Sequence, residues 1–276
     1  MSELGKVEGK TFLITGGASG LGAGYVESFL KDGAKAVAVL DIAEEVGKAF
    51  VEKLNEVYPG RVTFIKCDCS NEESLTQAFN AVVAMFKTVD VVINNAGVMN
   101  DNPNIWRKAS DVNYQGMVSL TLKSLKHMSK DEGGKGGTII NVSSTLGFLK
   151  FPYLPVYAGC KAGILHFSHS IAMDPFHQRT GVRIMVMCFG ATDTPLLHNF
   201  EKRSYDEKCS KEMAGTTGPT NMQKAESAVK GVVEAFKKGS NGTIWLVTDD
   251  QPAQDITSVI DDAYDRIQKT LYPTLS

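Results

Sequence analysis

The sequence predicts an α/β fold built on a doubly wound, parallel sheet. Three observations support this prediction. Short β-rich runs alternate with longer segments of helical periodicity, as they do in parallel sheets. Several of these runs, such as Val91–Ile93 and Ile184–Val186, are apolar at every position, as expected of strands that helices cover on both faces. No repeat, Pro-rich linker or charge block divides the chain, so residues 1–276 are predicted to form a single domain.

The predicted elements follow one another in a regular order. Strands are expected at residues 11–15, 36–41, 61–66, 90–93, 138–142, 182–186 and 243–247. The segments between them carry helical periodicity. After the third strand, for example, Leu75, Phe79, Val82 and Phe86 recur at steps of three and four residues, which is typical of an amphipathic helix that packs on a sheet.

Two later stretches depart from this alternation. Residues 198–221 are polar and show no sustained period, so we expect a substrate loop at about residues 192–222, since long loops in compact domains often cover binding sites. The C-terminal tail, about residues 250–276, carries apolar side chains on one face of an expected helix at 255–271. This helix is expected either to dock on its own subunit or to lie in a subunit interface or over a pocket.

The composition excludes several classes of protein. Hydrophobic residues make up 43% and charged residues 22% of the sequence, which is ordinary for a globular domain and argues against a disordered or collagen-like chain. The formal net charge of −2 offers no basic surface to a polyanion, so no nucleic-acid partner is expected.

The cysteines and the apolar runs indicate the compartment. Five cysteines, without a CxxC pair, argue against a disulfide framework and a zinc site. The chain begins with charges and glycines, and no run of about 18 apolar residues occurs, so neither a signal peptide nor a membrane span is expected. We expect a cytoplasmic protein. His166 and His169 share a helical face without an accompanying metal motif, so they are expected to be surface or packing residues, and no metal site is expected.

A glycine-rich turn follows the first strand. Thr15–Gly22 reads Thr-Gly-Gly-Ala-Ser-Gly-Leu-Gly and leads into an amphipathic helix. A pyrophosphate needs backbone N–H groups that point at it and no Cβ atom in the way, and glycines at a helix N-terminus meet both needs. A strand before the turn, a helix after it and an acidic residue beyond it favour a dinucleotide site over a merely tight turn. The residues expected at the phosphates are Gly16, Ser19, Gly20, Leu21 and Gly22.

The acidic residue, Asp41, indicates which dinucleotide binds. At the end of the second predicted strand, its carboxylate can accept hydrogen bonds from both hydroxyls of the adenosine ribose and would repel a 2′-phosphate. No Lys or Arg lies in the glycine turn, and Ile42, Ala43, Glu44 and Glu45 follow Asp41. We therefore expect NAD rather than NADP. Asp41 can also serve as the N-cap of the next helix, a role compatible with ribose binding.

Tyr157 and Lys161 form a second motif, one that indicates acid–base catalysis. Four residues apart on a predicted helix, they share one face, so the ammonium group can lie close to the phenol oxygen. Lowering the pKa of a tyrosine from about 10 to about 7 takes roughly 4 kcal/mol of stabilisation of the phenolate. A buried Lys161 beside an oxidised nicotinamide can supply this stabilisation of the phenolate. Ser144 ends the preceding strand, where ligands bind in open α/β sheets, and its hydroxyl is expected to hold a substrate oxygen against Tyr157.

Together these residues resemble the short-chain dehydrogenases/reductases of the classical type, over about residues 9–247. The resemblance implies a Rossmann-like fold and an NAD-dependent oxidoreductase. It also implies that Asp68 contacts the adenine, that Asn113 holds a proton-relay water and that Thr194 binds the nicotinamide carboxamide. Beyond the glycine turn, the residues implied at the cofactor are Asp41, Asp68, Asn95, Gly97, Tyr157, Lys161 and Thr194. The implied catalytic residues are Asn113, Ser144, Tyr157 and Lys161.

Within this family, the chain is most similar to the insect alcohol dehydrogenases and the 15-hydroxyprostaglandin dehydrogenases, for example in Asn241–Trp245. Two positions depart from the family pattern. Phe189 precedes Gly190 where the family usually has proline, which loosens this turn or brings an aromatic ring to the pocket. Leu154 stands where prostaglandin-oxidising members have a glutamine that helps to hold the substrate, which argues against prostaglandin as the natural substrate.

The expected activity is the NAD-dependent oxidation of a lipophilic, secondary alcohol to the ketone, with Tyr157 taking the hydroxyl proton. 15-Hydroxyprostaglandin, a steroid and an isoprenoid alcohol are alternative substrates, and a non-catalytic NAD- or lipid-binding protein is the alternative function. Family similarity implies a homodimer or homotetramer. The residues expected at the substrate are Ser144, Phe148, Leu154, Phe189 and Leu197, with Met99, Leu146, Leu149, Phe151, Tyr153, Leu196 and Phe200 as apolar neighbours.

Overall fold

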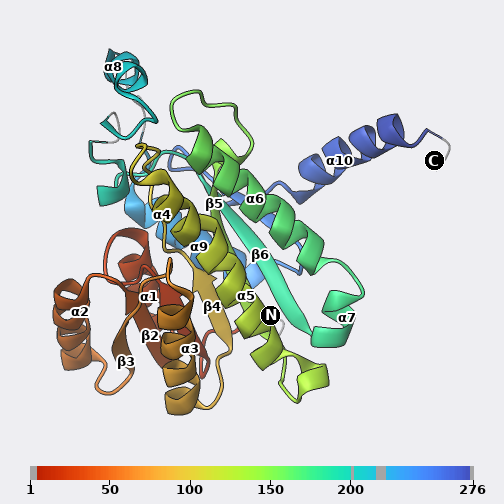
Figure 1. Ribbon diagram of the computed structural model, residues 1–276. Coiled ribbons are helices and arrows are strands. Elements are labelled where there is room, and N and C mark those ends of the chain that lie inside the picture. Colours follow the sequence, from red (N-terminus) through yellow and green to blue (C-terminus); the bar gives the residue numbers. More distant parts are fainter. Residues whose placement is uncertain (1–4, 200–201, 216–221, 274–276) are drawn as a thin grey trace.

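The computed structural model describes residues 5–199, 202–215 and 222–273. Its centre is an eight-stranded sheet in the order β3-β2-β1-β4-β5-β6-β7-β8 (Figure 1). Neighbouring strands pair in parallel, except that β8 runs antiparallel to β7. The strands are β1 Thr11–Thr15, β2 Ala36–Asp41, β3 Val62–Lys66, β4 Val91–Asn94, β5 Gly137–Ser144, β6 Val182–Phe189, β7 Ile244–Val247 and β8 Gln254–Asp255. The parallel sheet and its strands are confirmed, and only the short β8 was not predicted.

Helices cover both faces of this sheet (Figure 1). They are α1 Gly20–Lys31, α2 Glu44–Val57, α3 Glu72–Phe86, α4 Trp106–Ser110, α5 Met117–Met128, α6 Pro155–Ala172, α7 Phe176–Thr180, α8 Glu207–Gly215, α9 Ala225–Lys238 and α10 Thr257–Leu271. One core layer joins the sheet to α1, α2 and α9, and a second joins it to α3, α5 and α6. Within the part of the chain that the structure describes, no helix is both long and apolar enough to cross a membrane.

Side chains of the central strands alternate between the two core layers. In β1, Phe12 and Ile14 pack with α1 and α9, whereas Leu13 packs in the opposite layer. The ring of Phe12 stacks on that of Phe29 of α1 with a centroid distance of 4.4 Å. The ring centroid of Phe236 in α9 lies 5.8 Å from that of Phe12. Full burial of each such side chain contributes roughly 2–3 kcal/mol to folding. The fold is therefore the doubly wound, Rossmann-like sheet that the sequence predicts.

The strand order reverses at β1, which has β2 on one side and β4 on the other. In open α/β sheets, ligands bind outside the carboxyl ends of the strands at such a reversal. In this protein these ends carry the glycine turn after β1 and the Asn94–Gly97 segment at the end of β4.

A buried chain of hydrogen bonds fixes the next strand: Asn94 Nδ2 donates to Asn141 Oδ1 of β5 at 2.7 Å, and Asn141 Nδ2 donates to Ser168 Oγ of α6 at 2.9 Å.

The substrate loop contains more regular structure than its sequence indicates. It includes a 3-10 turn at Pro195–Leu197 and the helix α8. The polar sequence hides α8 because Met213 is the one buried residue of this helix, so no apolar stripe marks it. Phe200 and residues 216–221 lie outside the described residues.

The helix predicted in the tail is confirmed as α10, which extends away from the sheet (Figure 1). Its first half contacts α6 of the same chain. Asp261 Oδ1 lies 3.3 Å from His169 Nε2, and the ring of Tyr264 lies edge-on against the rings of His166 and His169. The two histidines therefore have the packing role expected of them. Further along, Ile267 and Leu271 are exposed, so α10 docks on its own subunit only in part.

Candidate active site

A cavity of about 820 Å³ follows the carboxyl ends of the parallel strands. The glycine turn and Asp41 line one end, and apolar side chains around Tyr157 line the other. Most of the predicted site residues meet in its wall: Gly16, Ser19, Gly20, Leu21, Asp41, Asp68, Asn95, Gly97, Ser144, Leu154, Tyr157, Lys161, Phe189, Thr194 and Leu197. Three other predicted residues, Gly22, Asn113 and Phe148, lie outside this lining.

Close backbone contacts shape the glycine turn. Gly16 has a φ of +63°, and a Cβ atom on it would lie 2.9 Å from the Cα atom of Ala96. A Cβ atom on Gly22 would lie only 2.0 Å from the carbonyl oxygen of Gly16. Gly22 thus lets the first turn of α1 pack beneath the loop, and it supports the site from behind rather than lining it.

Asn95 joins the glycine turn to the loop after β4. Its Nδ2 donates to the carbonyl oxygens of Thr15 at 3.0 Å and Gly16 at 3.2 Å. In return, Thr15 Oγ1 accepts hydrogen bonds from the N–H groups of Asn95 at 3.0 Å and Ala96 at 3.1 Å. The two loops that border the cavity are therefore held in one fixed arrangement.

Asp41 occupies the end of β2, at the same end of the cavity as the glycine turn. Its Oδ2 accepts from the N–H of Ala18 in the glycine turn at 3.0 Å, and its Oδ1 accepts from Ala43 N–H at 3.0 Å. Ala43 is itself the N-cap residue of α2, so Asp41 does not have the capping role that the sequence also allowed. The nearby cations Lys48 and Lys66 are paired with Glu44 at 2.8 and 2.9 Å.

Asp68 lies further along the same side. Its Oδ1 accepts from both the N–H and the hydroxyl of Ser70, at 2.9 and 2.6 Å. Its Oδ2 pairs with Lys108 Nζ at 3.0 Å. The carboxylate therefore has a fixed orientation at the cavity wall, where the family resemblance places the adenine.

Three of the four residues predicted for catalysis, Ser144, Tyr157 and Lys161, lie together where β5 ends and α6 passes. Ser144 Oγ donates to the carbonyl oxygen of Phe189 at 3.4 Å and accepts from the N–H of Leu146 at 3.2 Å. Lys161 Nζ donates to the carbonyl oxygen of Val142 at 2.9 Å and lies 5.5 Å from the centroid of the Tyr157 ring. Tyr157 and Lys161 are both buried.

Burial controls the ionisation of this group of residues. It raises the pKa of Tyr157 above its ordinary value, and the hydrogen bond with Ser144 opposes the rise only in part. Burial also lowers the pKa of Lys161 to about 8. The sequence predicts that Lys161 and a nicotinamide, acting together, make the phenol acidic. The groups of the protein by themselves leave it protonated, because the loss of water on burial outweighs the hydrogen bond from Ser144.

Asn113 lies beside the cavity rather than in its lining. It lies in a π-helical turn, Asp111–Gly116, a type of local structure that is common at functional sites. Its Oδ1 accepts from the N–H of Val98 and its Nδ2 donates to the carbonyl oxygen of Val98, both at 2.7 Å. The buried amide side chain thus holds the loop after β4, and the proton-relay role that the family resemblance implies for Asn113 stays a prediction.

The end of the cavity around Tyr157 is largely apolar. Phe148 and Leu149, which the sequence placed in this region, are exposed instead, because the chain turns outward after the 3-10 turn at Thr145–Gly147. Four residues of the substrate loop were missed, since no pattern in its sequence distinguishes them: Thr192, Pro195, Arg203 and Met213. Besides the predicted site residues, the apolar lining includes Met99, Leu146, Phe151 and Leu196.

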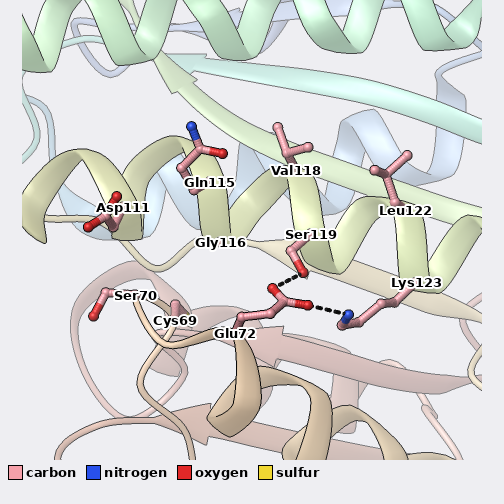
Figure 2. A pocket seen from close by; sticks show the side chains of 10 residues that line it. All are labelled: Cys69, Ser70, Glu72, Asp111, Gln115, Gly116, Val118, Ser119, Leu122 and Lys123. Atoms are coloured by element: carbon pink, nitrogen blue, oxygen red, sulfur yellow. Dashed lines mark hydrogen bonds and ion pairs between the residues drawn. The ribbon is translucent and has the colours of Figure 1, made fainter.

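A second hollow, of about 510 Å³, lies between α3 and α5 (Figure 2). Its central carboxylate belongs to Glu72, which accepts from Ser119 Oγ and from Lys123 Nζ, both at 2.6 Å. These contacts satisfy the charges of Glu72 and Lys123. Val118 and Leu122 point away from this carboxylate (Figure 2). We therefore place the candidate active site in the larger cavity.

Comparison with known proteins agrees with this geometry. The family model for the short chain dehydrogenases matches residues 10–204, and the chain belongs to this family of oxidoreductases. The rat 15-hydroxyprostaglandin dehydrogenase [NAD(+)] is 36% identical over 245 residues, which cover 88% of each chain. Alcohol dehydrogenase 1 of Ceratitis capitata is 30% identical over 240 residues, 86% of this chain and 91% of that one. The branch suggested by the sequence is thereby confirmed.

Solved structures include one of levodione reductase that resembles this chain in fold. The TM-score is 0.70 at 24% sequence identity, and the matched region covers 87% of this chain and 95% of that one. At this identity the similarity supports the fold alone.

Proposed function

We propose that this enzyme oxidises a lipophilic, secondary alcohol to the ketone and transfers the hydride to NAD. One observation carries the proposal: Ser144, Tyr157 and Lys161 meet in the wall of a cavity whose other end is formed by the glycine turn and Asp41. The names of the relatives, 15-hydroxyprostaglandin dehydrogenase [NAD(+)] and alcohol dehydrogenase, support both the cofactor and the reaction.

The residues of the cavity fit a dinucleotide. Gly16 and Gly20 of the turn carry no Cβ atom and line the cavity, so backbone N–H groups can approach a pyrophosphate closely. The Asp41 carboxylate, held by Ala18, suits the ribose hydroxyls of NAD and disfavours the extra phosphate of NADP. When bound, NAD supplies the hydride acceptor.

Each group of the catalytic set has one task. The Ser144 hydroxyl holds the alcohol oxygen in position, and the Tyr157 oxygen takes the proton of the alcohol. Lys161 stabilises the negative charge that Tyr157 carries before it takes that proton. Asn113 acts indirectly, by fixing the loop at Val98 along the cavity.

The apolar lining predicts how rate depends on substrate length. In a series of secondary alcohols, kcat/KM is expected to rise about fourfold per added methylene until the apolar end is filled, because each buried methylene contributes about 0.8 kcal/mol. Nicotinamide absorbance measures the rate, and primary alcohols of equal length serve as the control. Rates that do not depend on length would contradict the proposal of a lipophilic substrate. Bound NAD without turnover of any alcohol would favour the alternative of a binding protein.

The same panel distinguishes the alternative substrates. 15-Hydroxyprostaglandin, steroid and isoprenoid alcohols each bring a secondary or allylic hydroxyl on a large apolar body. The buried Leu154 side chain in the cavity wall offers no hydrogen-bonding group to a polar substrate chain, and this favours the less polar members of the panel.

Cofactor preference depends on Asp41. We expect Asp41→Ala to weaken NAD binding about tenfold, the equivalent of roughly 1.4 kcal/mol, and to improve the use of NADP, because it removes an acceptor and a repulsive charge together. The ratio of kcat/KM for the two cofactors is the measurement. Glu45→Ala removes an exposed carboxylate of the same segment and should leave this ratio unchanged. An unchanged ratio in Asp41→Ala would contradict the assignment.

We further propose that the enzyme is a homo-oligomer, a homodimer or homotetramer, and that it acts in the cytoplasm. The exposed apolar side chains of Val259, Ile267 and Leu271 on α10 support an interface between copies. The five cysteines are free thiols, which suits a reducing compartment. Light scattering after gel filtration tests the oligomer, and a particle with the mass of one chain would contradict it.

A further inference from the structure

The first turn of the catalytic helix α6 requires hydrogen-bond acceptors from elsewhere in the chain. Helix N-termini leave their first N–H groups without partners inside the helix. At the start of α6, Leu154 occupies the N-cap position with an apolar side chain, and Pro155 has no N–H to donate. Ala158 N–H donates to the carbonyl oxygen of Leu154 at 3.0 Å. The N–H groups of Val156 and Tyr157 remain, and buried N–H groups need a partner.

Asp101 supplies both acceptors. Its Oδ2 accepts from the N–H of Val156 at 2.6 Å, and its Oδ1 accepts from the N–H of Tyr157 at 3.0 Å. The residue is 1% exposed. A carboxylate in this position is also favoured by the positive end of the helix dipole. The N–H held at 3.0 Å belongs to the residue whose phenol lines the cavity.

Asp101 also connects α6 to the two segments that border the active site. It lies in the loop that follows β4, four residues beyond Gly97 in the cavity wall. Its N–H donates to the carbonyl oxygen of Arg203 at 2.8 Å. The Arg203 guanidinium in turn donates to the carbonyl oxygens of Leu196 at 2.9 Å and His198 at 2.6 Å, within the substrate loop.

We propose that Asp101 is a positioning residue for the acid–base tyrosine. Its carboxylate fixes the first turn of α6, and with it the Tyr157 phenol, against the loop after β4 and the substrate loop. This inference rests on the proposed role of Tyr157. Since Tyr157 is itself one of the two residues held, a shift of this turn moves the phenol directly, and a displacement of about 1 Å is enough to slow a reaction about 100-fold.

Asp101→Asn tests the proposal with little change in shape. The amide keeps one acceptor but turns an NH₂ group toward one of the two N–H groups of the helix. We expect kcat to fall about 10- to 100-fold, while the Kd of NAD, measured by protein fluorescence, stays unchanged. Hydrogen exchange at the amides of Val156 and Tyr157 should become faster. Rates are expressed per NAD-binding site, so that unfolded protein does not enter the comparison.

A matched control exists at α9. Asp250 caps that helix from a distant loop, accepting from the N–H of Lys224 at 2.9 Å and from the hydroxyl of Ser227 at 2.5 Å. Asp250→Asn makes the same chemical change in a carboxylate that caps a helix outside the cavity lining. It is expected to lower stability and to leave kcat at the wild-type value.

The outcomes separate the two proposals. If Tyr157→Phe keeps wild-type turnover, the proposed function fails. If Tyr157→Phe abolishes turnover while Asp101→Asn loses no more kcat than Asp250→Asn, Asp101 is only structural and the inference is overturned. Should Asp101→Asn not fold, Asp101→Glu decides the question: it keeps the charge but moves the carboxylate by one methylene. It should lower kcat about tenfold, and wild-type kcat in this variant would overturn the inference.

Discussion

Replacing Tyr157 with phenylalanine is expected to lower kcat by about 10²- to 10⁴-fold, the range in which positioned acid–base groups contribute to catalysis. Phenylalanine keeps the ring, which packs with Met99 and Leu154, and removes only the hydroxyl. NAD binding should therefore remain intact, because the glycine turn and Asp41 are untouched. Nicotinamide absorbance gives the rate, and fluorescence titration gives the affinity for NAD.

Tyr25→Phe is the matched control for this variant. Tyr25 lies in α1, its side chain is buried, and its hydroxyl has no hydrogen-bond partner among the described residues. The same atom is removed, away from the lining of the cavity, so kcat should not change, and stability should rise because an unpaired polar group is lost. Wild-type turnover in Tyr157→Phe would refute the assignment of the acid–base group.

Replacing Lys161 with methionine is expected to reduce kcat about 100-fold or more and at the same time to stabilise the fold. Burial lowers the pKa of this lysine from 10.5 to about 8, which corresponds to a cost of about 3 kcal/mol for the charged form at neutral pH. Methionine keeps the apolar stem but loses the hydrogen bond to the carbonyl oxygen of Val142, at a cost of about 1 kcal/mol. Urea unfolding at pH 7 should show a net gain of about 1–2 kcal/mol.

This gain in stability should depend on pH. The pKa of Lys161 is about 8 in the folded protein, below its unfolded value of 10.5, so between these pH values the unfolded chain binds more protons. The contribution of Lys161 to stability therefore rises with pH across this window. Below about pH 8 the full cost is present, and above about pH 10.5 it is gone. The difference between Lys161→Met and the wild type should shrink accordingly, and a constant difference would show that burial of the ammonium group is not the cause of the gain.

The sequence predicted the sheet and most of the residues that line the candidate site, because both are encoded locally. Apolar runs mark the buried strands, and the glycine turn, Asp41 and the Tyr157–Lys161 pair each lie within a short motif at a strand or helix end. Short motifs at the carboxyl ends of neighbouring strands converge in any parallel sheet of this order. The cavity could therefore be predicted before its shape was known.

The parts that escaped prediction depend on contacts between distant residues. Asp101 holds N–H groups that lie 55 and 56 positions later in the chain, and only the missing cap at Leu154–Pro155 hints that a partner is needed. The rise in the pKa of Tyr157 comes from burial on all sides, which spacing along a helix does not reveal. The outward turn of Phe148 follows from a 3-10 turn whose residues carry no strong signal.

The short strand β8 has a consequence for how the folded protein behaves among many copies of itself. It pairs Asp255 with Trp245 and Gln254 with Leu246, and so occupies the outer edge of β7. Left open, the Ile-Trp-Leu-Val sequence of that strand would offer a row of backbone groups to any passing extended chain. Two polar residues close this edge and are too short to recruit another strand, so the start of the tail protects the enzyme against aggregation.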